Sequence, residues 1–192
     1  MNSPYSILLA SGSPRRRELL RQLPIQFKVA PADIDESACA SESPKDYVQR
    51  MAIEKALAGF LKDGGEVPSM GADTIVLLDG EILGKPVSRE DAVTMLQRLS
   101  GRTHEVYSAV AVALATDRII DTLNITAVTF GSMTKDWIAK YCQTDEPMDK
   151  AGAYAVQGDT GRFISRIEGS YTGVMGLPLY ETARLLQKAG LL

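Results

Sequence analysis

The sequence predicts an α/β protein, because segments with strand patterns and segments with helix patterns alternate along its 192 residues. Short apolar runs bounded by turn residues indicate strands, and serines followed by proline or an acidic residue indicate helix starts. Two long β segments in the middle of the chain indicate central strands of an extended, strongly twisted mixed sheet. The length suits one domain over residues 1–192, or one domain with two lobes.

The first third of the chain predicts two strands and two helices. Ser13 and Ser43 each precede a proline; serine is a good helix cap, and proline suits the first helical position. The expected elements are a strand over 7–10, a helix from 14, a strand over 27–30, a loop over 31–43 and a helix from 43 to about 61. Residues 62–68, with two glycines and mixed charge, form the most linker-like stretch.

Turn and cap signals predict the remaining elements. Asp79-Gly80 is a strong hairpin signal, and Ser88 caps a helix that Ser100-Gly101 ends. The expected elements are strands over 72–78 and 81–83, a helix over 88–99, strands over 105–114 and 119–130, and helices over 134–142 and 177–188. Residues 151–176 are glycine-rich and predict mostly strand or loop.

Composition narrows the classes of partner. A net charge of −3 and a pI near 5.3 argue against a nucleic-acid or membrane binder, which needs a broad basic face. The two cysteines lie far apart without metal-type spacing, as expected for free thiols in a reducing cytosol. No cleavable signal, lipidation motif or long apolar run occurs in the sequence, so we expect a cytoplasmic protein.

The most informative motif is Ser11-Gly12-Ser13-Pro14-Arg15-Arg16, at a predicted strand-to-helix turn. Its arginines lie at the positive end of the helix dipole, where acidic residues are favoured. A bound anion resolves this conflict, since phosphate oxygens would accept hydrogen bonds from the free helix N–H groups, the serine hydroxyls and the arginines. The alternative is a solvated basic turn with an ordinary cap. The motif is not a P-loop, because no Gly-Lys-Ser/Thr follows at the required spacing.

Asp73 stands in Ala72-Asp73-Thr74, at the start of a predicted apolar strand. Fully buried aspartates without partners are rare, so Asp73 is expected to face a cleft where it binds a cation or activates water. The alternative is a strand-end carboxylate that caps a neighbouring turn.

Two lysines are candidates for phosphate contact. Glycine and proline fix the backbone on either side of Lys85, which indicates a positioned charge rather than a mobile one. Lys55 lies beside Glu54 in a predicted helix, and an exposed ion pair explains it equally well.

An acidic loop carries Asp33, Asp35 and Glu36. These carboxylates could ligate Mg²⁺ or Mn²⁺, which favour oxygen ligands and usually need only one or two protein carboxylates beside substrate phosphates. A solvated acidic surface loop is the alternative. His104 is the only histidine and opens a β segment, so we expect a structural histidine rather than a zinc site or a Ser-His-Asp mechanism.

Gln157 lies between glycine-flanked segments in the stretch 150–158. Its amide offers both a donor and an acceptor, which reading the edge of a base requires. It could equally be a polar loop residue. Downstream, Gly169-Ser170-Tyr171 and Gly176-Leu177-Pro178 indicate tight turns and a helix start rather than catalysis.

Six blocks stand out along the sequence: Leu9 to Arg16, Gly71-Ala72-Asp73-Thr74, Gly84-Lys85-Pro86, Ser100 to His104, Lys150 to Tyr154, and Val174 to Pro178. Taken together and in this order, they resemble the Maf family of nucleoside triphosphate pyrophosphatases over essentially the whole chain. Any one block would be a weak signal, whereas six in the family's order are highly specific.

The resemblance implies hydrolysis of a nucleoside triphosphate between its α and β phosphates, giving a monophosphate and pyrophosphate, with a divalent cation, Mg²⁺ or Mn²⁺. It implies that Asp73 is the proton acceptor and that Glu36 and Asp73 are metal ligands. It also implies a two-lobed α/β fold with a long twisted mixed sheet, helices on both sides and a cleft between the lobes, often as a homodimer. The polar and basic cleft residues it implies are Ser11, Arg15, Arg16, Lys55 and Lys85, beside Ser13 of the same turn.

Within the family, Arg15, Thr74 and Gln157 resemble the specificity trio of the dTTP/UTP pyrophosphatase branch. A branch that acts on 7-methyl-GTP carries Trp, Gln and Glu at the matching places. The Gln157 amide can pair with both a carbonyl and the imide N–H of uracil or thymine, whereas a glutamate suits guanine donors. The resemblance therefore implies dTTP and UTP as substrates, and leaves open modified pyrimidine nucleotides in a house-cleaning role.

Two other functions remain open at this point. A nucleotide-binding regulator of cell division, such as the septum inhibition associated with the family, would use the same phosphate contacts without hydrolysis. A phosphatase would release orthophosphate rather than pyrophosphate from the same substrate.

Overall fold

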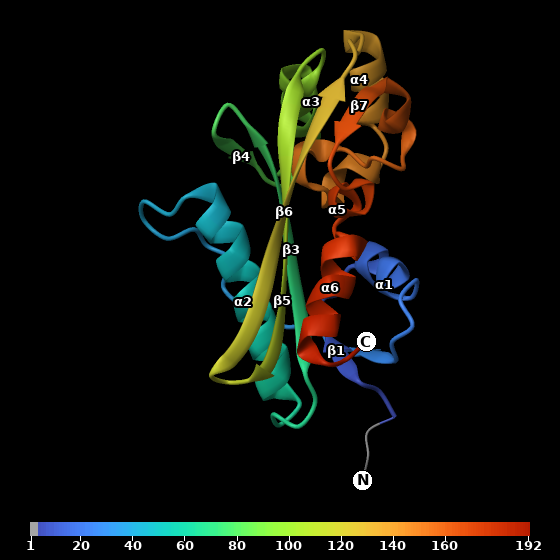
Figure 1. The fold of residues 1–192 in the computed structure, drawn as a ribbon. Coiled ribbons are helices and arrows are strands. Elements are labelled where there is room, and N and C mark those ends of the chain that lie inside the picture. Colours follow the sequence, from blue (N-terminus) through green and yellow to red (C-terminus); the bar gives the residue numbers. More distant parts are fainter. Residues whose placement is uncertain (1–3) are drawn as a thin grey trace. The chain divides into compact units, whose positions relative to one another are not determined.

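The structure, a computed structural model, describes residues 4–192 and is an α/β fold built on a mixed sheet (Figure 1). The α/β class predicted from the alternating patterns is confirmed. The elements in chain order are β1 (Ile7–Leu9), α1 (Pro14–Leu20), β2 (Phe27–Val29), α2 (Pro44–Lys62), β3 (Ser69–Leu78), β4 (Glu81–Leu83), α3 (Arg89–Leu99), β5 (Thr103–Ala115), β6 (Arg118–Phe130), α4 (Lys135–Tyr141), the 3₁₀ helices η1 (Glu146–Asp149), η2 (Ala151–Ala153) and η3 (Asp159–Phe163), β7 (Ile164–Glu168), α5 (Tyr171–Met175) and α6 (Leu179–Ala189).

The sheet has seven strands in the order β2-β1-β3-β5-β6-β7, with β4 paired to β3. Strand β1 runs parallel to both β2 and β3, whereas the β3–β4 and β6–β7 pairs are antiparallel. The sheet is therefore mixed, as the two long central segments predicted.

The chain forms two compact units, and β3, β5 and β6 contribute residues to both. The first unit contains residues 1–73, 108–124 and 176–192, and the second contains 74–107 and 125–175. The boundary on β3 falls between Asp73 and Thr74.

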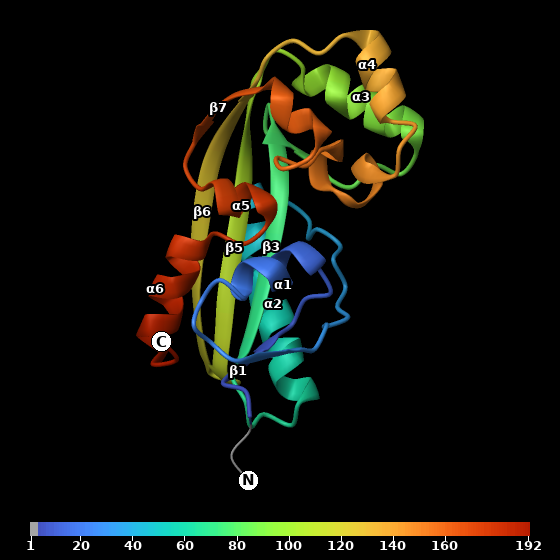
Figure 2. The same ribbon diagram turned by 90° about the vertical axis from the view of Figure 1, so that its right-hand side faces the viewer.

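In the first unit, α2 covers one face of the sheet, and α1 and α6 lie on the opposite face (Figures 1 and 2). Strand β1 lies between β2, which follows α1, and β3, which follows α2. Parallel crossovers are right-handed, so the β1-to-β2 and β2-to-β3 crossovers, which run across the sheet in opposite directions, place α1 and α2 on opposite faces.

The helix starts lie where the caps predicted them. The Ser13 hydroxyl accepts from the backbone N–H of Arg16 at 3.4 Å, with Pro14 at the first helical position. The same contact begins α2, where Ser43 accepts from Asp46 at 3.2 Å. Ser88 and Thr134 cap α3 and α4 in the same way.

Two segments differ from the sequence prediction. Strand β3 begins at Ser69 rather than Ala72, because its first residues pair with β1, so Asp73 lies inside the strand and not at its start. The stretch 151–176 contains two 3₁₀ helices and the short helix α5 besides strand β7. These helices are too short for an apolar period to be recognised. The Asp79-Gly80 hairpin is confirmed, and both residues adopt the positive φ that a two-residue hairpin turn requires.

Each unit has its own buried residues. In the first, Ile7, Leu8 and Leu9 of β1 are fully buried, as are Met51 and Ala52 of α2. In the second, apolar side chains of β3, α3, β6 and α4 form one cluster that includes Phe130 and Tyr154.

His104 lies in the second core, stacked on the Phe130 ring at a centroid distance of 5.4 Å. Its Nε2 is 2.8 Å from the Tyr154 hydroxyl, and its buried Nδ1 has no hydrogen-bond partner among residues 4–192. Burial lowers the pKa of His104 from 6.5 to about 4. The structure thus gives this histidine the structural role that the sequence predicted.

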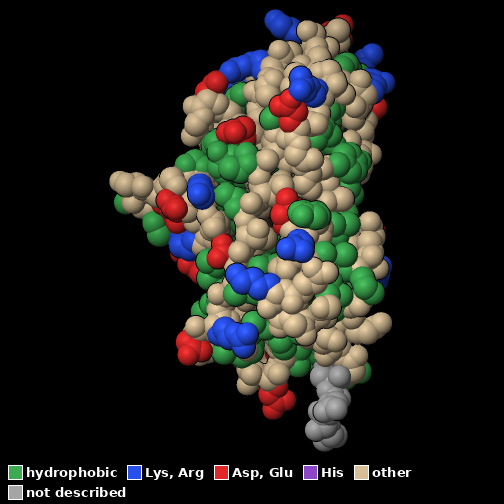
Figure 3. Space-filling view, in the orientation of Figure 1, with side chains coloured by type: hydrophobic (Ala, Val, Ile, Leu, Met, Phe, Trp, Pro, Cys, Tyr) green, Lys and Arg blue, Asp and Glu red, His purple; other side chains and the backbone are tan. Residues whose placement is uncertain are grey.

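Acidic and basic side chains are interspersed on the face drawn in Figure 3, which accords with the net charge of −3. Among residues 4–192, no helix combines the length and the apolar character needed to cross a membrane.

Lowering the pH should destabilise the protein through His104. Because its folded pKa is lower than its unfolded pKa, the unfolded chain binds the proton more tightly, and stability falls as the pH drops from 6.5 towards about 4. The expected loss of unfolding free energy between pH 7 and pH 5 is about 2 kcal/mol. Urea denaturation of wild type and His104→Gln across this range measures it, and an equal pH dependence in both proteins would contradict the assignment.

Candidate active site

The turn between β1 and α1 gathers polar groups around Ser11. The Ser11 hydroxyl oxygen, in a residue that is 7% exposed, accepts from the backbone N–H of Ser13 at 3.3 Å. It also accepts from Nη1 of Arg16 at 3.4 Å. Helix α1 has only seven residues and no acidic residue in its first turn, so the arginine side chains carry most of the positive charge here.

Arg16 is held from a distant part of the sequence. Its Nε donates to the backbone carbonyl of Gly176 at 2.9 Å, across 160 positions of the chain. Burial lowers the pKa of Arg16 below its ordinary value; the charges of Asp73 and Glu36 oppose this shift, and the charge of Arg15 adds to it. The guanidinium therefore lies within the electrostatic influence of both carboxylates.

Lys55 of α2 reaches two carboxylates at once. Its Nζ is 2.8 Å from Asp73 Oδ1 and 2.8 Å from Glu36 Oε1. The side chains of Lys55 and Asp73 are only 10% and 13% exposed. The exposed ion pair considered for Lys55 is therefore wrong, because Glu54 pairs with another residue of the helix, Arg50. A buried ammonium needs such partners, since an unpaired charge away from water is strongly destabilising.

Gly71 makes this contact sterically accessible. A Cβ on Gly71 would overlap the backbone of Ala52 and Ala56 in α2 and lie 2.9 Å from Cβ of Lys55. With glycine there, β3 packs directly against the turn of α2 that carries Lys55. Two residues further on, Asp73 is one of only two half-buried positions in an otherwise buried strand.

The acidic loop contributes one of its three candidates to this cluster. Glu36, whose side chain is 57% exposed, pairs with Lys55. Asp35 instead accepts from the backbone N–H of Ser37 at 2.9 Å, and hydrogen bonds from the side chain and then the backbone of Ser37 lower the pKa of Asp35. Asp33 is exposed.

The donor set fits a hard divalent cation. Glu36 and Asp73 already converge on one positive charge, the Lys55 ammonium, and carboxylate oxygens are the ligands that Mg²⁺ and Mn²⁺ prefer. No group of three or more His, Cys, Asp or Glu side chains suited to a metal occurs within residues 4–192. A cation held by these two carboxylates would take its other ligands from phosphates and water.

Three further candidates belong to the second unit. Thr74 is half-buried on β3, and Lys85 and Gln157 are exposed. The backbone beside Lys85 is tied down, because the carbonyl of Gly84 accepts from the N–H of Gly152 at 3.0 Å. This bond links two of the motifs that the sequence singled out.

Comparison with known proteins places this arrangement in a family. The family model described as Maf-like protein matches residues 6–189. The chain belongs to the Maf family. It is 51% identical over 181 residues to the dTTP/UTP pyrophosphatase of Escherichia coli (strain K12), covering 94% of this chain and 91% of that one. It is also 50% identical to the dTTP/UTP pyrophosphatase of Methylobacillus flagellatus, covering 96% and 92%.

Solved structures share the fold of this Maf family member at low sequence identity. A HAM1 protein from Coxiella burnetii superposes with a TM-score of 0.54 at 15% identity, covering 95% of this chain and 98% of that one. The Ham1 protein of Staphylococcus aureus gives 0.53 at 13% identity, covering 96% and 98%. These likenesses support the α/β fold with its long mixed sheet.

Sequence reasoning did not find all of the contacts in this Maf-like site. The sequence predicts only a tight turn and a helix start at Gly176, whereas the Gly176 carbonyl accepts a hydrogen bond from Arg16. It also gave no role to Tyr47 or Arg50 of α2, which hold the loop that carries Glu36. No local pattern marks these residues, because their partners lie in other segments.

Replacing Gly71 with alanine should both destabilise the protein and separate Lys55 from Asp73. The added methyl group meets backbone atoms of α2, so strand and helix must move apart, at a cost of about 2 kcal/mol. Urea denaturation measures the loss. Gly84→Ala is the matched control, because nothing lies within 4 Å of its Cβ position. Equal stability of Gly71→Ala and wild type would contradict the close packing.

Proposed function

We propose that this protein is a nucleoside triphosphate pyrophosphatase that hydrolyses dTTP and UTP to the monophosphate and pyrophosphate. The observation that carries the proposal is the Asp73–Lys55–Glu36 cluster in the same unit as the Ser11–Arg16 turn, in a chain about half identical to curated dTTP/UTP pyrophosphatases. A hydrolase needs a carboxylate that can handle a proton beside cationic groups that hold phosphates, and the first unit contains both.

On this proposal, the phosphates bind to the basic and hydroxyl side chains. Arginine forks are suited to phosphate oxygens, and Arg16 is pre-positioned by its bonds to Gly176 and Ser11. The Ser11 oxygen accepts twice, which leaves its O–H to donate to a phosphate. Arg15, Ser13 and Lys85 complete the set of groups assigned to the triphosphate.

Asp73 orients and deprotonates the attacking water. Lys55 engages Oδ1 of Asp73, so the second carboxylate oxygen, Oδ2, is the one that accepts the water proton. Fixing one oxygen restricts the rotation of the carboxylate, which aids alignment of the water with the α phosphorus. Lys55 thus acts through the orientation of Asp73 as well as through its own charge.

Glu36 and Asp73 are the residues that would hold a divalent cation, whose chemistry is to neutralise charge on the phosphates and on the departing pyrophosphate. The single positive charge of Lys55 offsets only one of these two negative charges, so the pair of carboxylates keeps an excess negative charge that a cation would offset. A requirement for Mg²⁺ or Mn²⁺ belongs to the proposal, and the identity of the metal is decided by the assay below.

Substrate choice is assigned to Arg15, Thr74 and Gln157. The amide of Gln157 donates to a carbonyl and accepts from the imide N–H of uracil or thymine, whereas the adjacent N1–H and N2–H donors of guanine suit a glutamate. The exposure of Gln157 supports its access to a ligand.

The proposal includes the cellular compartment and the oligomeric state of the enzyme. The described cysteines, Cys39 and Cys142, are both free, which supports a reducing compartment such as the cytoplasm. The homodimer that the family resemblance implies is part of the same proposal, and sedimentation of the purified protein measures it.

Asp73→Asn should abolish turnover while leaving nucleotide binding largely intact. The amide no longer accepts the water proton, and the expected fall in kcat is about 1,000-fold, within the range for loss of a general base. Pyrophosphate release is measured with dTTP, UTP, CTP, ATP, GTP and 7-methyl-GTP, with and without Mg²⁺ or Mn²⁺. Binding of a labelled nucleotide is measured in parallel.

The outcomes of this assay separate the functions. Metal-dependent pyrophosphate release from dTTP and UTP by wild type, lost in Asp73→Asn, supports the proposal. Near wild-type turnover in the variant overturns the role of Asp73. Nucleotide binding without any pyrophosphate release would favour the regulator, and orthophosphate as the product would favour a phosphatase.

Gln157→Glu should lower kcat/KM for dTTP and UTP by about 10- to 100-fold, because a carboxylate cannot donate to a pyrimidine carbonyl. Gln97→Glu, an exposed position on α3, is the matched control for the added charge. Unchanged preference among the six nucleotides in the Gln157 variant would remove this residue from the specificity set.

A further inference from the structure

The loop over residues 31–42 carries Glu36 and has neither helix nor strand structure. A side chain on such a loop keeps a fixed position only when other contacts hold the loop. Helix α2 supplies several such contacts. At one end of the loop, Nζ of Lys62 donates to the carbonyl of Pro31 at 3.1 Å.

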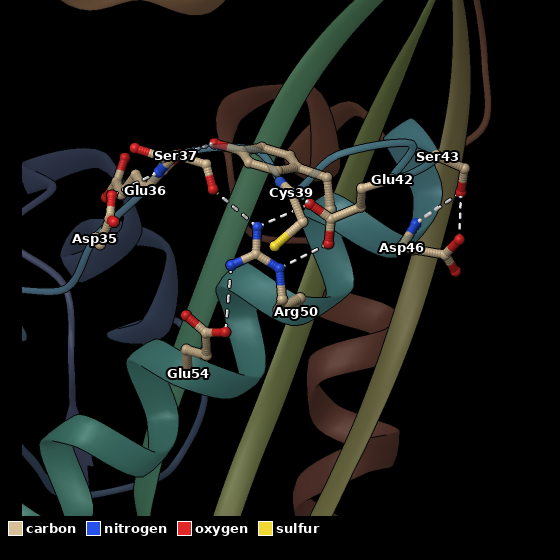
Figure 4. Close-up of polar contacts among 10 residues, drawn as sticks. Asp35, Glu36, Ser37, Cys39, Glu42, Ser43, Asp46, Arg50 and Glu54 are labelled. Carbon is tan, nitrogen blue, oxygen red and sulfur yellow. Dashed lines mark hydrogen bonds and ion pairs between the residues drawn. The ribbon is translucent and has the colours of Figure 1, made fainter.

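Arg50 of α2 clamps the other end (Figure 4). Its Nε and Nη2 donate to the two carboxylate oxygens of Glu42 at 2.6 and 2.8 Å, in the bidentate geometry that arginine favours. Its Nη2 also donates to the carbonyl of Ser37 at 3.0 Å, and its Nη1 donates to Glu54 at 3.2 Å. The guanidinium thus joins two positions of the loop to the helix.

Glu42 closes the clamp from inside the loop. Its side chain is only 9% exposed, and its Oε2 accepts from the backbone N–H of Cys39 at 3.1 Å. The hydrogen bonds from Arg50 lower the pKa of Glu42 to about 2, so this carboxylate stays charged at neutral pH.

Tyr47 holds the backbone of Glu36, the loop residue whose carboxylate pairs with Lys55. Its hydroxyl donates to the backbone carbonyl of Glu36 at 2.9 Å. The pKa of Tyr47 is raised, chiefly by burial and then by the charges of Asp73 and Glu36, so the phenol remains a donor. Tyr47 and Lys55 therefore bind the backbone and the side chain of the same residue from two turns of one helix.

We propose that Tyr47 and Arg50 are positioning residues that hold the Glu36 carboxylate beside Lys55 and Asp73, and so set the affinity of this pair of carboxylates for a divalent cation. The inference rests on the proposed function for its catalytic meaning. Residues that orient a ligand typically alter metal affinity or activity by about 10- to 100-fold when they are replaced.

The test uses Arg50→Gln, Arg50→Lys and Tyr47→Phe, each alone and in a Glu36→Gln background. Arg98→Gln is the matched control, because Arg98 makes a comparable 2.6 Å ion pair with Glu81 on elements that do not include the loop. Three quantities are measured: amide hydrogen exchange over residues 36–42, Mn²⁺ binding to the nucleotide-free protein by electron paramagnetic resonance, and the metal concentration for half-maximal turnover.

Arg50→Gln should speed exchange in the loop and weaken Mn²⁺ binding by about 10-fold or more. Tyr47→Phe should have a smaller effect and weaken Mn²⁺ binding by about 3- to 10-fold. Arg50→Lys should restore part of the affinity, since it keeps the charge but loses the bidentate contact. Neither loss should persist in the Glu36→Gln background, and Arg98→Gln should match wild type. If Arg50 and Tyr47 had a merely structural role, their effects would add to that of Glu36→Gln, so the absence of additivity distinguishes positioning from structure.

Three results would overturn the proposal. The first is faster loop exchange in the Arg50 and Tyr47 variants with unchanged Mn²⁺ affinity. The second is an equal loss of Mn²⁺ affinity in these variants with Glu36 intact and in the Glu36→Gln background. The third is no Mn²⁺ binding by wild type. Failure of the proposed function looks different. In that case wild type binds Mn²⁺ and the Arg50 variant loses it as expected, while no nucleotide yields pyrophosphate.

Discussion

A lysine ammonium enclosed by protein is the interaction around which the first unit is organised. The Lys55 side chain is 10% exposed and must be balanced where it lies, because an unpaired charge away from water is strongly destabilising. Asp73 on β3 and Glu36 on the acidic loop supply that balance at 2.8 Å each. One electrostatic requirement therefore brings a helix, a strand and a loop to a single point.

Packing and charge support each other at this point. Gly71 allows β3 to lie against α2 without overlap, and this contact brings Asp73 within reach of Lys55. The same helix then fixes the loop through Tyr47 and Arg50. Helix α2 thus acts as the scaffold of the site, and rigid scaffolds hold catalytic groups more accurately than loops do.

Local signals were sufficient for much of the fold. Serine caps at Ser13, Ser43 and Ser88 start helices because a side-chain oxygen satisfies a free N–H over three residues. The start of β3 was misjudged, since pairing with β1 extends the strand to Ser69, and such pairing leaves no mark in the local pattern. The short helix Tyr171–Met175 was missed because five residues hold little periodicity.

The sequence by itself determined the α/β class, the helix starts, the hairpin, and the motifs that identify the family and the candidate residues. Only the tertiary structure decided that Lys55 is enclosed between two carboxylates, and that Arg16 is anchored by Gly176. The Lys55–Asp73 bond joins positions 18 residues apart, and the Arg16–Gly176 bond joins positions 160 residues apart. Caps and turns depend on neighbours within a few residues, whereas the environment of a charge depends on which distant segments pack around it.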